Sequence, residues 1–478
     1  MLAALLTCLI PNDLDKILDD PRLAGAIISC CVADESGATL YERNSSTRVM
    51  PASNQKLLTN SFALAILGPG YQPKTRLWRM RARVVVDSPG DPMMTHERLT
   101  QAAAELHLKN IREVDVREAY RPLIGPSWEW DDLPNRYAAP ISAFTVDRGS
   151  VELWGQGDRL WVEPRFYWLE PQRGTKTGPT KIVYDPIRRT LTVNGELPKT
   201  AARLDTLSLD QPDQAASMYL GRRFRLIDQV PSRTQDLTLV GPPLSTTMKD
   251  CLVHSDNNLA ENLLLMAASK IKPLGRDPYA DADQDLTRFL TQTVGEEPGD
   301  FHPEDGSGMS RHDLVTTRGI VKLLQWDLRQ STKDVWLDAL AKPGAGTLAD
   351  RLKGVPFAGK TGTLDMVVAL SGYVHTKKDR ILTVSLILNH FICKDSEARA
   401  IADAFIEKLA DDDSFGTNPE LGLSHEARPP DSCYRSPGPH RNARPRFDGG
   451  HARERTDRRA QSGHAPDDRS QRVAVRGR

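Results

Sequence analysis

The sequence predicts a mixed α+β fold, and two observations carry that prediction. Two stretches rich in β-branched and apolar residues, 24–44 and 357–391, are interrupted by turn residues in the manner of antiparallel strands. The segments between and after them place apolar residues at the spacing of amphipathic helices. No repeat period is evident along the chain.

Each element can be placed from its local pattern. A hairpin is predicted at 24–44, followed by a helix that opens near Ser53 and stops at Gly68. Near the other end, we expect residues 357–375 and 380–391 to form two adjacent antiparallel strands. The remaining predicted helices cover residues 245–271, 317–328, 334–341 and 395–413.

The pattern also predicts how the chain divides into domains. Residues 76–243 mix short strands, a helix and polar loops, which indicates one or two inserted subdomains. Residues 1–75 and 244–412 would together build the main domain. Residues 415–478 are rich in Arg, Pro, Gly and Asp and nearly lack apolar residues, so we expect a disordered, solvated tail rather than a nucleic-acid-binding one. Out-of-frame coding would also produce this composition.

The composition excludes several classes of function. The chain has 478 residues, and its formal net charge of +0 gives no electrostatic argument for binding nucleic acid or an anionic membrane. Its six cysteines show no metal-ligand spacing and are expected to be small buried residues. No HExxH, P-loop or dinucleotide-binding motif is present, so we expect no metal and no cofactor.

The apolar N-terminal stretch from Leu2 to Ile10 is too short to span a bilayer and lacks a positive flank. It is either the remnant of a signal peptide that starts upstream or a first helix, and the residues leave both interpretations open. A lipoprotein cysteine at Cys8 is disfavoured because Thr7 precedes it. We therefore expect no transmembrane segment.

Three short polar motifs occur in a fixed order: Ser53-x-x-Lys56, Ser255-Asp256-Asn257 and Lys360-Thr361-Gly362. Each is weak alone, because a second S-x-x-K begins at Ser269 and a second K-T-G begins at Lys176. Ser269 lies at the end of a predicted helix, and Lys176 lies in a polar loop ahead of the S-D-N. By contrast, Ser53 opens an apolar-faced helix, and Lys360 enters a β-rich run that can be central in a sheet.

Ser53 can be either a helix N-cap or a nucleophile. Ser and Lys at positions i and i+3 share a helix face, so Lys56 can take the serine proton if its surroundings lower its pKa. A helix N-terminus disfavours a charged lysine and offers the N–H of Ser53 to a developing oxyanion. Ser255 would then relay a proton to the leaving amine, and Asn257 would hold Lys56 and the substrate amide.

The third motif would bind the substrate. Lys360 supplies positive charge, and the strand through Thr361, Gly362 and Thr363 would align an extended peptide by adding it to the sheet. Gly362 would allow close backbone approach. The N–H of Thr363 would be a second oxyanion donor, and its hydroxyl would meet a terminal carboxylate.

Together these motifs resemble the D-alanyl-D-alanine carboxypeptidase/endopeptidase family (peptidase family S13, low-molecular-mass penicillin-binding proteins). The long interval between Ser53 and Ser255 leaves room for that family's insertion, whereas class A β-lactamases have a much shorter interval. Further matches are the stretches GDPMMTHERL, WEWDDLPNRYAAPISAF, HSDNNLAENLL and EDGSGMSRHDLVT. The resemblance covers about residues 24–410; the poor export signal and the Arg-rich C-terminal end depart from it.

The resemblance implies a three-layer α/β/α sandwich of the serine β-lactamase/D,D-peptidase type, with a five-stranded antiparallel sheet and inserted mainly-β or mixed subdomains. It implies a serine-type D-Ala-D-Ala carboxypeptidase or D,D-endopeptidase that forms an acyl-enzyme on Ser53. The expected partners are peptidoglycan stem peptides ending in D-Ala-D-Ala and β-lactam antibiotics, with no nucleic acid. The expected location is the periplasm or the cell envelope.

Two other functions stay open: a β-lactamase or esterase on the same scaffold, and a non-catalytic penicillin-sensing or wall-binding module. The resemblance implies that Asp131 or Asp132 can bind the amino group of a diamino-acid side chain, although loop solvation is favoured for both. Ser307, in EDGSGMSRHD, is expected in a structural turn rather than as a second nucleophile. His254 is expected to be a packed or surface histidine.

Overall fold

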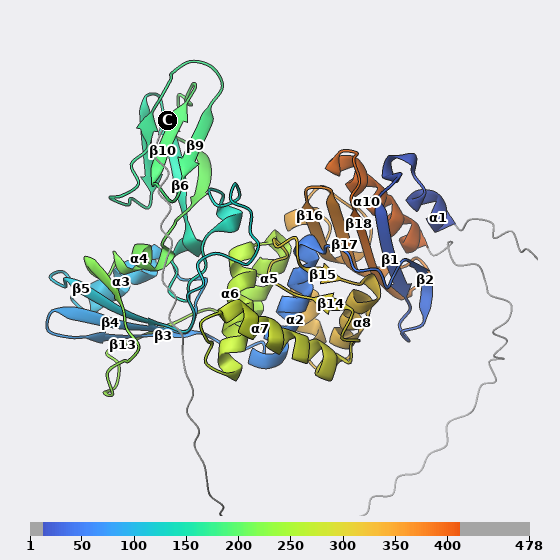
Figure 1. Cartoon of the computed structure of the whole chain (residues 1–478), viewed down its shortest axis with the longest axis horizontal. Helices are drawn as coiled ribbons and strands as arrows, with labels where there is room; N and C mark the ends of the chain where they lie inside the picture. The colour runs from blue at the N-terminus through green and yellow to red at the C-terminus, as the bar shows by residue number, and fades with distance from the viewer. Residues whose placement is uncertain (1–12, 412–478) are drawn as a thin grey trace, which may run out of the picture. The chain divides into compact units, whose positions relative to one another are not determined.

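The computed structural model describes residues 13–411, in which a five-stranded antiparallel sheet joins strands from both ends of the described chain (Figure 1). The strand order is β16-β17-β18-β1-β2, and every neighbouring pair is antiparallel. This sheet confirms the expected one. Its strands are β1 (Ile27–Ala33), β2 (Thr39–Arg43), β16 (Phe357–Leu364), β17 (Val367–His375) and β18 (Ile381–Asn389).

Helices cover both faces of this sheet. The side chains of strands β17 and β18 are therefore buried on each face. Along β17, Leu370 belongs to the core beneath α10 and α1, while Ala369 belongs to the core beneath α8. The result is the expected three-layer sandwich. The covering helices are α1 (Asp13–Leu18) and α10 (Asp395–Asp411) on one face, with α8 (Thr317–Leu328) on the other.

Helix α2 (Gln55–Leu67) is buried among the helices of the α8 side. A helix buried all round is ordinarily apolar, yet α2 carries a run of buried polar side chains in its first two turns. Such groups need hydrogen-bond partners inside the protein, so the run marks α2 as more than a packing element. The helices around it are α5 (Leu244–His254), α6 (Asn257–Ile271), α7 (Pro278–Arg288) and α9 (Lys333–Ala339), with a π-helical turn at Phe289–Val294.

A second, mixed five-stranded sheet is formed by residues 74–240, in the order β12-β5-β4-β3-β13. Its apolar side chains share one hydrophobic cluster with helices α3 and α4 and with apolar residues of the segment 144–209. The elements are β3 (Lys74–Arg79), β4 (Arg83–Ser88), α3 (His96–Glu105), β5 (Glu113–Glu118), α4 (Pro212–Ser217), β12 (Arg223–Leu226) and β13 (Leu237–Val240).

Two three-stranded sheets complete this part of the chain, in the orders β11-β6-β7 and β8-β10-β9 (Figure 1). The described residues fall into a single unit by their contacts, so the predicted division at residues 76 and 243 stays a prediction. The strands are β6 (Ser150–Gln156), β7 (Arg159–Glu163), β8 (Gln172–Arg173), β9 (Lys181–Asp185), β10 (Thr190–Asn194) and β11 (Ala202–Ser208).

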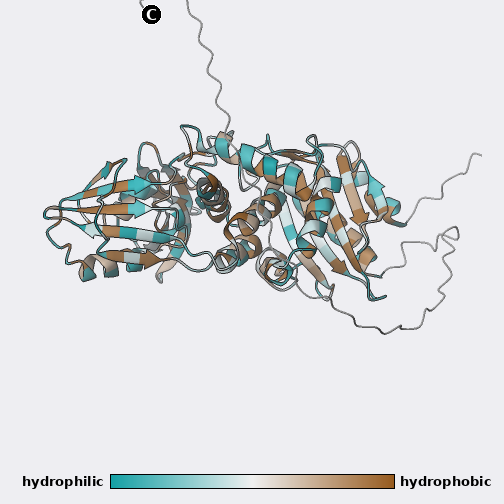
Figure 2. Ribbon diagram, turned by 90° about the horizontal axis from the view of Figure 1, so that it is seen from below, coloured by the Kyte–Doolittle hydropathy of each residue, from teal (hydrophilic) through white to brown (hydrophobic). Residues whose placement is uncertain are grey.

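Hydrophobic residues are concentrated where the elements face one another. Figure 2 shows strands banded in brown and teal, as expected for strands whose alternate residues face the core.

A short hairpin, β14 (Phe301–His302) and β15 (Leu314–Val315), flanks the loop that contains Ser307. That loop lies against the N-terminal end of α2, where Gly308 approaches the carbonyl of Ala52.

Three predictions about elements were wrong. Residues 357–375 form a hairpin rather than one strand, because Met366 has a positive φ of 60° and turns the chain between β16 and β17. Strand β16, which carries Lys360, is therefore an edge strand and not a central one. The predicted helix at 245–271 is broken at Ser255, whose left-handed φ of 59° ends α5.

The predictions for Leu2–Ile10, Cys8 and residues 415–478 lie outside the described residues. The final predicted helix ends, within the described range, at Asp411. From residue 13 to residue 411, no helix combines the length and the apolar character that crossing a membrane requires.

Candidate active site

Ser53 and Lys56 lie where a 3₁₀ turn leads into helix α2. The turn spans Ala52–Asn54, and Lys56 Nζ lies 2.9 Å from Ser53 Oγ. The two side chains therefore share a face, as their spacing predicted. The N-cap interpretation of Ser53 was wrong: Asn54 occupies the cap position of α2, and the Ser53 hydroxyl contacts the lysine instead.

Lys56 is completely buried and has three oxygen neighbours. Besides Ser53, its amine donates to Asn257 Oδ1 at 2.7 Å and to the main-chain carbonyl of Ser307 at 2.7 Å. Burial lowers the pKa of Lys56, because a charged amine loses its hydration there. Nearby Cys251 and acidic residues oppose that shift. The net direction favours the neutral amine that a general base requires.

The S-D-N motif forms the junction between α5 and α6. Ser255 has left-handed backbone angles, φ 59° and ψ 38°, which are uncommon for a residue with a side chain and typical of functional turns. Asp256 is the N-cap of α6, with its carboxylate accepting from the N–H of Leu259. Asn257 follows, with its Oδ1 toward Lys56 and its Nδ2 donating to the carbonyl of Tyr137 at 2.9 Å.

Lys360 connects the third motif to the second. Its amine is completely buried, 2.9 Å from Ser255 Oγ and 2.8 Å from the carbonyl of Thr361. Burial lowers the pKa of Lys360 well below its usual range, and the neighbouring Lys56 lowers it further. The expectation that Lys360 supplies positive charge stays a prediction, and burial opposes it by disfavouring the charged form of the amine.

The edge position of β16 leaves part of its backbone facing outward. Gly359 pairs with Ala341, on the side away from β17, through both its N–H and its carbonyl. Every second residue of a strand turns its N–H and carbonyl to the same side, so those of Thr361 and Thr363 also face away from β17. The carbonyl of Thr361 accepts from Lys360. Thr363 is exposed and lines the cavity described next, which places its N–H where a strand-like ligand can pair.

Gly362 allows close backbone approach, as predicted, and the backbone that approaches it is the turn that carries Ser53. A Cβ at this position would lie 2.8 Å from the carbonyl oxygen of Pro51 and 3.1 Å from the Cβ of Ala52. The glycine therefore lets the strand with Lys360 approach the turn with Ser53. Gly308 does the same from the opposite loop, where a Cβ would lie 1.8 Å from the carbonyl of Ala52.

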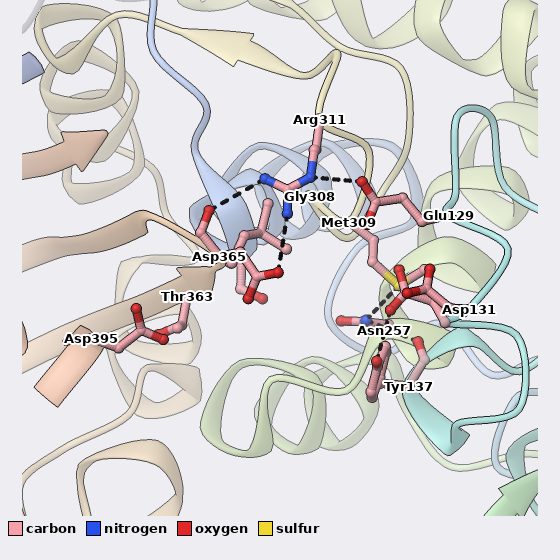
Figure 3. A pocket seen from close by; sticks show the side chains of 13 residues that line it. Glu129, Asp131, Tyr137, Asn257, Gly308, Met309, Arg311, Thr363, Asp365 and Asp395 are labelled. Carbon is pink, nitrogen blue, oxygen red and sulfur yellow. Dashed lines mark hydrogen bonds and ion pairs between the residues drawn. The ribbon is translucent and has the colours of Figure 1, made fainter. Parts of the chain in front are cut away.

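A cavity of about 500 Å³ opens in front of these motifs, with Ser53, Asn257 and Thr363 on its wall. Figure 3 shows the cavity with Asn257 and Thr363 labelled. Lys56 and Lys360 lie buried behind that wall. The lining is strongly acidic, and its single cation is Arg311, which pairs with Glu129 at 3.0 Å and lies 3.7 Å from Asp365. The acidic lining residues are Glu129, Asp131, Asp132, Asp365 and Asp395.

Asp131 and Asp132 therefore line the cavity, whereas loop solvation was favoured for both from the sequence. Asp131 is exposed, and Asp132 accepts a hydrogen bond of 2.7 Å from the Tyr137 hydroxyl. Partial burial raises the pKa of Asp132, although the Tyr137 bond opposes the shift. Both carboxylates are placed where a cationic ligand group can reach them.

The remaining sequence predictions can be placed as well. Ser307 is buried in a turn, as expected, and His254 is a surface histidine beside Asp250. The second S-x-x-K is not a pair, because the Ser269 hydroxyl donates to the carbonyl of Met266 and Lys272 pairs with Asp281 instead.

Four contributors were missed from the sequence. Arg136 and Arg148 both pair with the buried carboxylate of Asp256, while the carbonyls of Tyr137 and Ser307 accept hydrogen bonds from Asn257 and Lys56. The arginines carry no local signal. The D-G-S-G run around Ser307 was a signal, since two glycines and a buried aspartate predict a loop of close backbone approach.

Among residues 13–411, one group has the geometry to hold a metal ion: His96, Glu97 and Asp147. His96 already pairs with Asp147 at 2.8 Å and with Glu97 at 3.0 Å through opposite ring nitrogens. None of the three lines the cavity of Ser53.

Comparisons with known proteins identify relatives of this chain. The D-alanyl-D-alanine carboxypeptidase of Actinomadura sp. (strain R39) is 28% identical over 463 residues, which cover 84% of each chain. The D-alanyl-D-alanine carboxypeptidase DacB of Haemophilus influenzae is 23% identical, covering 75% of this chain and 84% of its own.

The fold matches a solved structure of the same kind. The crystal structure of penicillin binding protein 4 (dacB) from Haemophilus influenzae superposes with a TM-score of 0.68 at 20% identity, covering 84% of this chain and 99% of that one. The family model for D-Ala-D-Ala carboxypeptidase 3 (S13) matches residues 10–411. Since that match spans nearly the whole described chain, the protein belongs to the D-Ala-D-Ala carboxypeptidase 3 (S13) family.

Proposed function

We propose that this protein is a serine-type D-Ala-D-Ala carboxypeptidase and D,D-endopeptidase that cleaves peptidoglycan peptides through an acyl-enzyme on Ser53. One observation carries the proposal: a hydroxyl on the cavity wall lies 2.9 Å from the amine of a fully buried lysine. A hydroxyl is a weak nucleophile until a base removes its proton, and burial favours the neutral, basic form of Lys56.

In the acylation step, Ser53 Oγ attacks the carbonyl carbon of the terminal peptide bond while its proton passes to Lys56. The C–N bond then breaks, and the leaving amine takes a proton from the Ser255 hydroxyl, whose Oγ is 2.9 Å from Lys360 Nζ. The proton that Lys56 removed from Ser53 is returned to Ser255, so Lys56 is neutral again. Water afterwards attacks the ester while Lys56 takes a proton from it, the shortened peptide leaves as the acid, and that proton passes to Ser53 Oγ to restore the hydroxyl. The N–H groups of Ser53 and Thr363 would stabilise the oxyanion.

The substrate would bind as an added strand along β16. The outward backbone at Thr363 would supply main-chain pairing, and the hydroxyl of Thr363, which lines the cavity, would meet the terminal carboxylate. The acidic cavity, with Asp131 and Asp132 on its wall, favours a peptide whose side chain ends in a free amino group. The same arrangement suits the carboxylate and strained amide of a β-lactam.

Relatives support this assignment. Two relatives are named D-alanyl-D-alanine carboxypeptidases, and penicillin binding protein 4 of Haemophilus influenzae has been crystallised with a β-lactam. We further propose a location in the cell envelope, where peptidoglycan lies. Residues 1–75 and 244–412 would form the catalytic domain and residues 76–243 an insertion, which the separate hydrophobic cluster of that segment supports.

Labelling with a fluorescent penicillin, followed by peptide mapping, tests the proposal. The label is expected on the peptide that contains Ser53, and Ser53→Ala is expected to abolish both the label and the release of D-alanine. Ser61→Ala, on the same helix but bonded to Asp327, is the control. A label on another peptide would overturn the assignment of the nucleophile.

The rates separate this function from the two alternatives. Hydrolysis of a D-Ala-D-Ala peptide that is faster than penicillin turnover supports the peptidase. Rapid penicillin turnover without peptide cleavage would show a β-lactamase instead. Stable labelling of Ser53 with neither reaction would show a penicillin-sensing module.

Gly362→Ala is expected to lower the acylation rate by at least about tenfold, because the added Cβ would push β16 away from the Ser53 turn. Gly70→Ala is the control, since a Cβ there meets nothing within 4 Å. The second-order rate constant for penicillin acylation measures the effect. A wild-type rate in Gly362→Ala would show that the close approach to Pro51 has no role.

A further inference from the structure

A neutral lysine amine has two N–H hydrogens and one lone pair, and only the lone pair can accept a proton from a serine. Lys56 has three oxygen neighbours: Ser53 Oγ at 2.9 Å, Asn257 Oδ1 at 2.7 Å and the carbonyl of Ser307 at 2.7 Å. The rate of proton transfer from Ser53 therefore depends on which neighbours take the two hydrogens.

The side chain of Asn257 takes one of them. Its Nδ2 donates to the main-chain carbonyl of Tyr137 at 2.9 Å. Turning the amide over would set its oxygen against that carbonyl, so Oδ1 must face Lys56. Asn257 is thus an acceptor for the lysine and cannot act as a donor to it.

The carbonyl of Ser307 takes the other hydrogen, since a main-chain carbonyl can only accept. We propose that this carbonyl is the group that orients Lys56: with Asn257 Oδ1 it engages both N–H hydrogens and leaves the lone pair directed at Ser53 Oγ. The inference rests on the proposed function, in which neutral Lys56 is the base.

The carbonyl is held by a loop built around a buried carboxylate. Asp305 Oδ1 accepts from the N–H groups of Ser307 at 2.9 Å and Gly308 at 2.6 Å. Its Oδ2 accepts from the N–H of Ser310 at 2.8 Å and from the indole of Trp128 at 3.0 Å. Four donors converge on one fully buried side chain, which fixes the loop between Asp305 and Ser310.

Two further bonds tie this loop to the helices that flank the site. The hydroxyl of Thr59 donates to the carbonyl of Gly306 at 2.7 Å, and Glu261 Oε2 accepts from the N–H of Gly306 at 2.8 Å. Thr59 lies one turn beyond Lys56 on α2. The helix that carries the base therefore also anchors the loop that orients it, and Thr59 is a positioning residue in this scheme.

Thr59 allows a test that changes no charge near the lysine. The titratable groups that act on Lys56 come from every element packed against it: Lys360 on β16, Cys251 on α5, Asp256 before α6, Glu261 on α6 and Asp305 in the loop. Thr59→Val replaces a hydroxyl with a methyl group of similar size and leaves all of these groups in place.

Thr59→Val is expected to lower the plateau of the penicillin acylation rate by about tenfold, the cost of loosening one buried hydrogen bond in the support of the base. Thr59→Ser should restore the rate to within about twofold, because the hydroxyl returns. Ser61→Ala is the matched control: Ser61 is equally buried on α2, and its hydroxyl bonds Asp327 at 2.8 Å instead of the loop. It should lower the thermal unfolding midpoint without changing the rate.

The pH profile separates orientation from a general loss of structure. A carbonyl stabilises a lysine ammonium more than an amine, so a loosened Ser307 carbonyl should move the acid limb of the profile to lower pH while the plateau falls. A fraction of misfolded protein would lower the plateau and leave the limb in place, which would overturn the proposal.

An unchanged plateau in Thr59→Val, or an equal loss in Ser61→Ala, would overturn it as well. If Thr59→Val does not fold, Thr59→Ala removes the same hydroxyl and carries the test. Failure of the proposed function is distinguishable, because it would appear in the wild-type protein, either as no label on Ser53 or as a labelled Ser53 without hydrolysis of a D-Ala-D-Ala peptide.

Discussion

Replacing Lys56 with Met is expected to lower the rate of Ser53 acylation by about 10³-fold, the usual contribution of a positioned general base. Met fills the buried space of the lysine but cannot take a proton. It also leaves Asn257 Oδ1 and the Ser307 carbonyl without their donor, so the thermal unfolding midpoint should fall. Both quantities are measured on purified protein, by fluorescent penicillin acylation and by calorimetry.

Lys56→Arg makes the experiment sharper. An arginine offers the same neighbours N–H donors but stays charged at any accessible pH. Its acylation rate should therefore be as low as that of Lys56→Met. An Arg variant with wild-type acylation would contradict the role of base and leave only a structural role. Lys270→Met, at an exposed position on α6, is the control and should match the wild type.

The pH dependence of the wild type follows from the same group. Lys56 is a base only when neutral, so the acylation rate should rise as pH passes upward through its pKa and fall below it. Burial lowers that pKa, while Cys251, Asp305, Glu261 and Asp256 oppose the shift. The acid limb is thus expected below the range of an exposed lysine, and it should be absent from Lys56→Met.

The sequence was sufficient to predict that Ser53, Lys56, Ser255 and Lys360 come together. Three short motifs in a fixed order were selected over their duplicates by helix and strand context, and in the structure the first two motifs meet through Lys56 while the last two meet through Lys360. The prediction of an antiparallel sheet with helices succeeded for a similar reason, since strand and helix periodicity are local properties.

Other features depend on contacts between distant residues and could not be read from local pattern. The turn at Met366 carries no glycine, so a hairpin was taken for one strand, and β16 was placed inside the sheet instead of at its edge. Ser255 adopts a left-handed backbone conformation, although it is neither a glycine nor an asparagine, the residues whose presence would have predicted one. Sequence periodicity contains neither kind of information.

The ion pairs of Asp256 are the clearest example of such contacts. Arg136 and Arg148 come from the segment between the first two motifs, and both reach the carboxylate that separates Ser255 from Asn257. Arg148 also pairs with Asp250 on α5. The segment that looked like an accessory insertion therefore supports the S-D-N motif directly.

Removing both arginines should destabilise the protein by about 3–5 kcal/mol, because it leaves the buried carboxylate of Asp256 without its two ion-pair partners. In the wild type, burial raises the pKa of Asp256, but Arg136 and Arg148 outweigh burial and lower it. A lowered pKa in the folded state stabilises the fold above the unfolded pKa of about 4. That stability is lost as pH falls through the folded pKa.

In Arg136→Ala/Arg148→Ala we expect the sign to reverse, since burial is the largest influence on the pKa of Asp256 and the arginines no longer oppose it. The N–H of Leu259 still lowers that pKa, but we expect the folded value to lie above the unfolded one. The variant should be least stable at neutral pH and should recover as pH falls toward 4. Urea unfolding at pH 5 and pH 7.5 measures the difference. A loss of stability that does not depend on pH would show that the arginines act through packing.

Adding Asp256→Asn to the double variant removes the buried charge while keeping a side chain that can cap α6. The triple variant should regain most of the lost stability at pH 7.5. We expect the double and the triple variant alike to acylate more slowly than the wild type, because Ser255 and Asn257 flank a residue that the two arginines no longer hold. If stability recovers but the acylation rate does not, the arginines have two roles: they neutralise the buried charge of Asp256, and they also align Ser255 and Asn257.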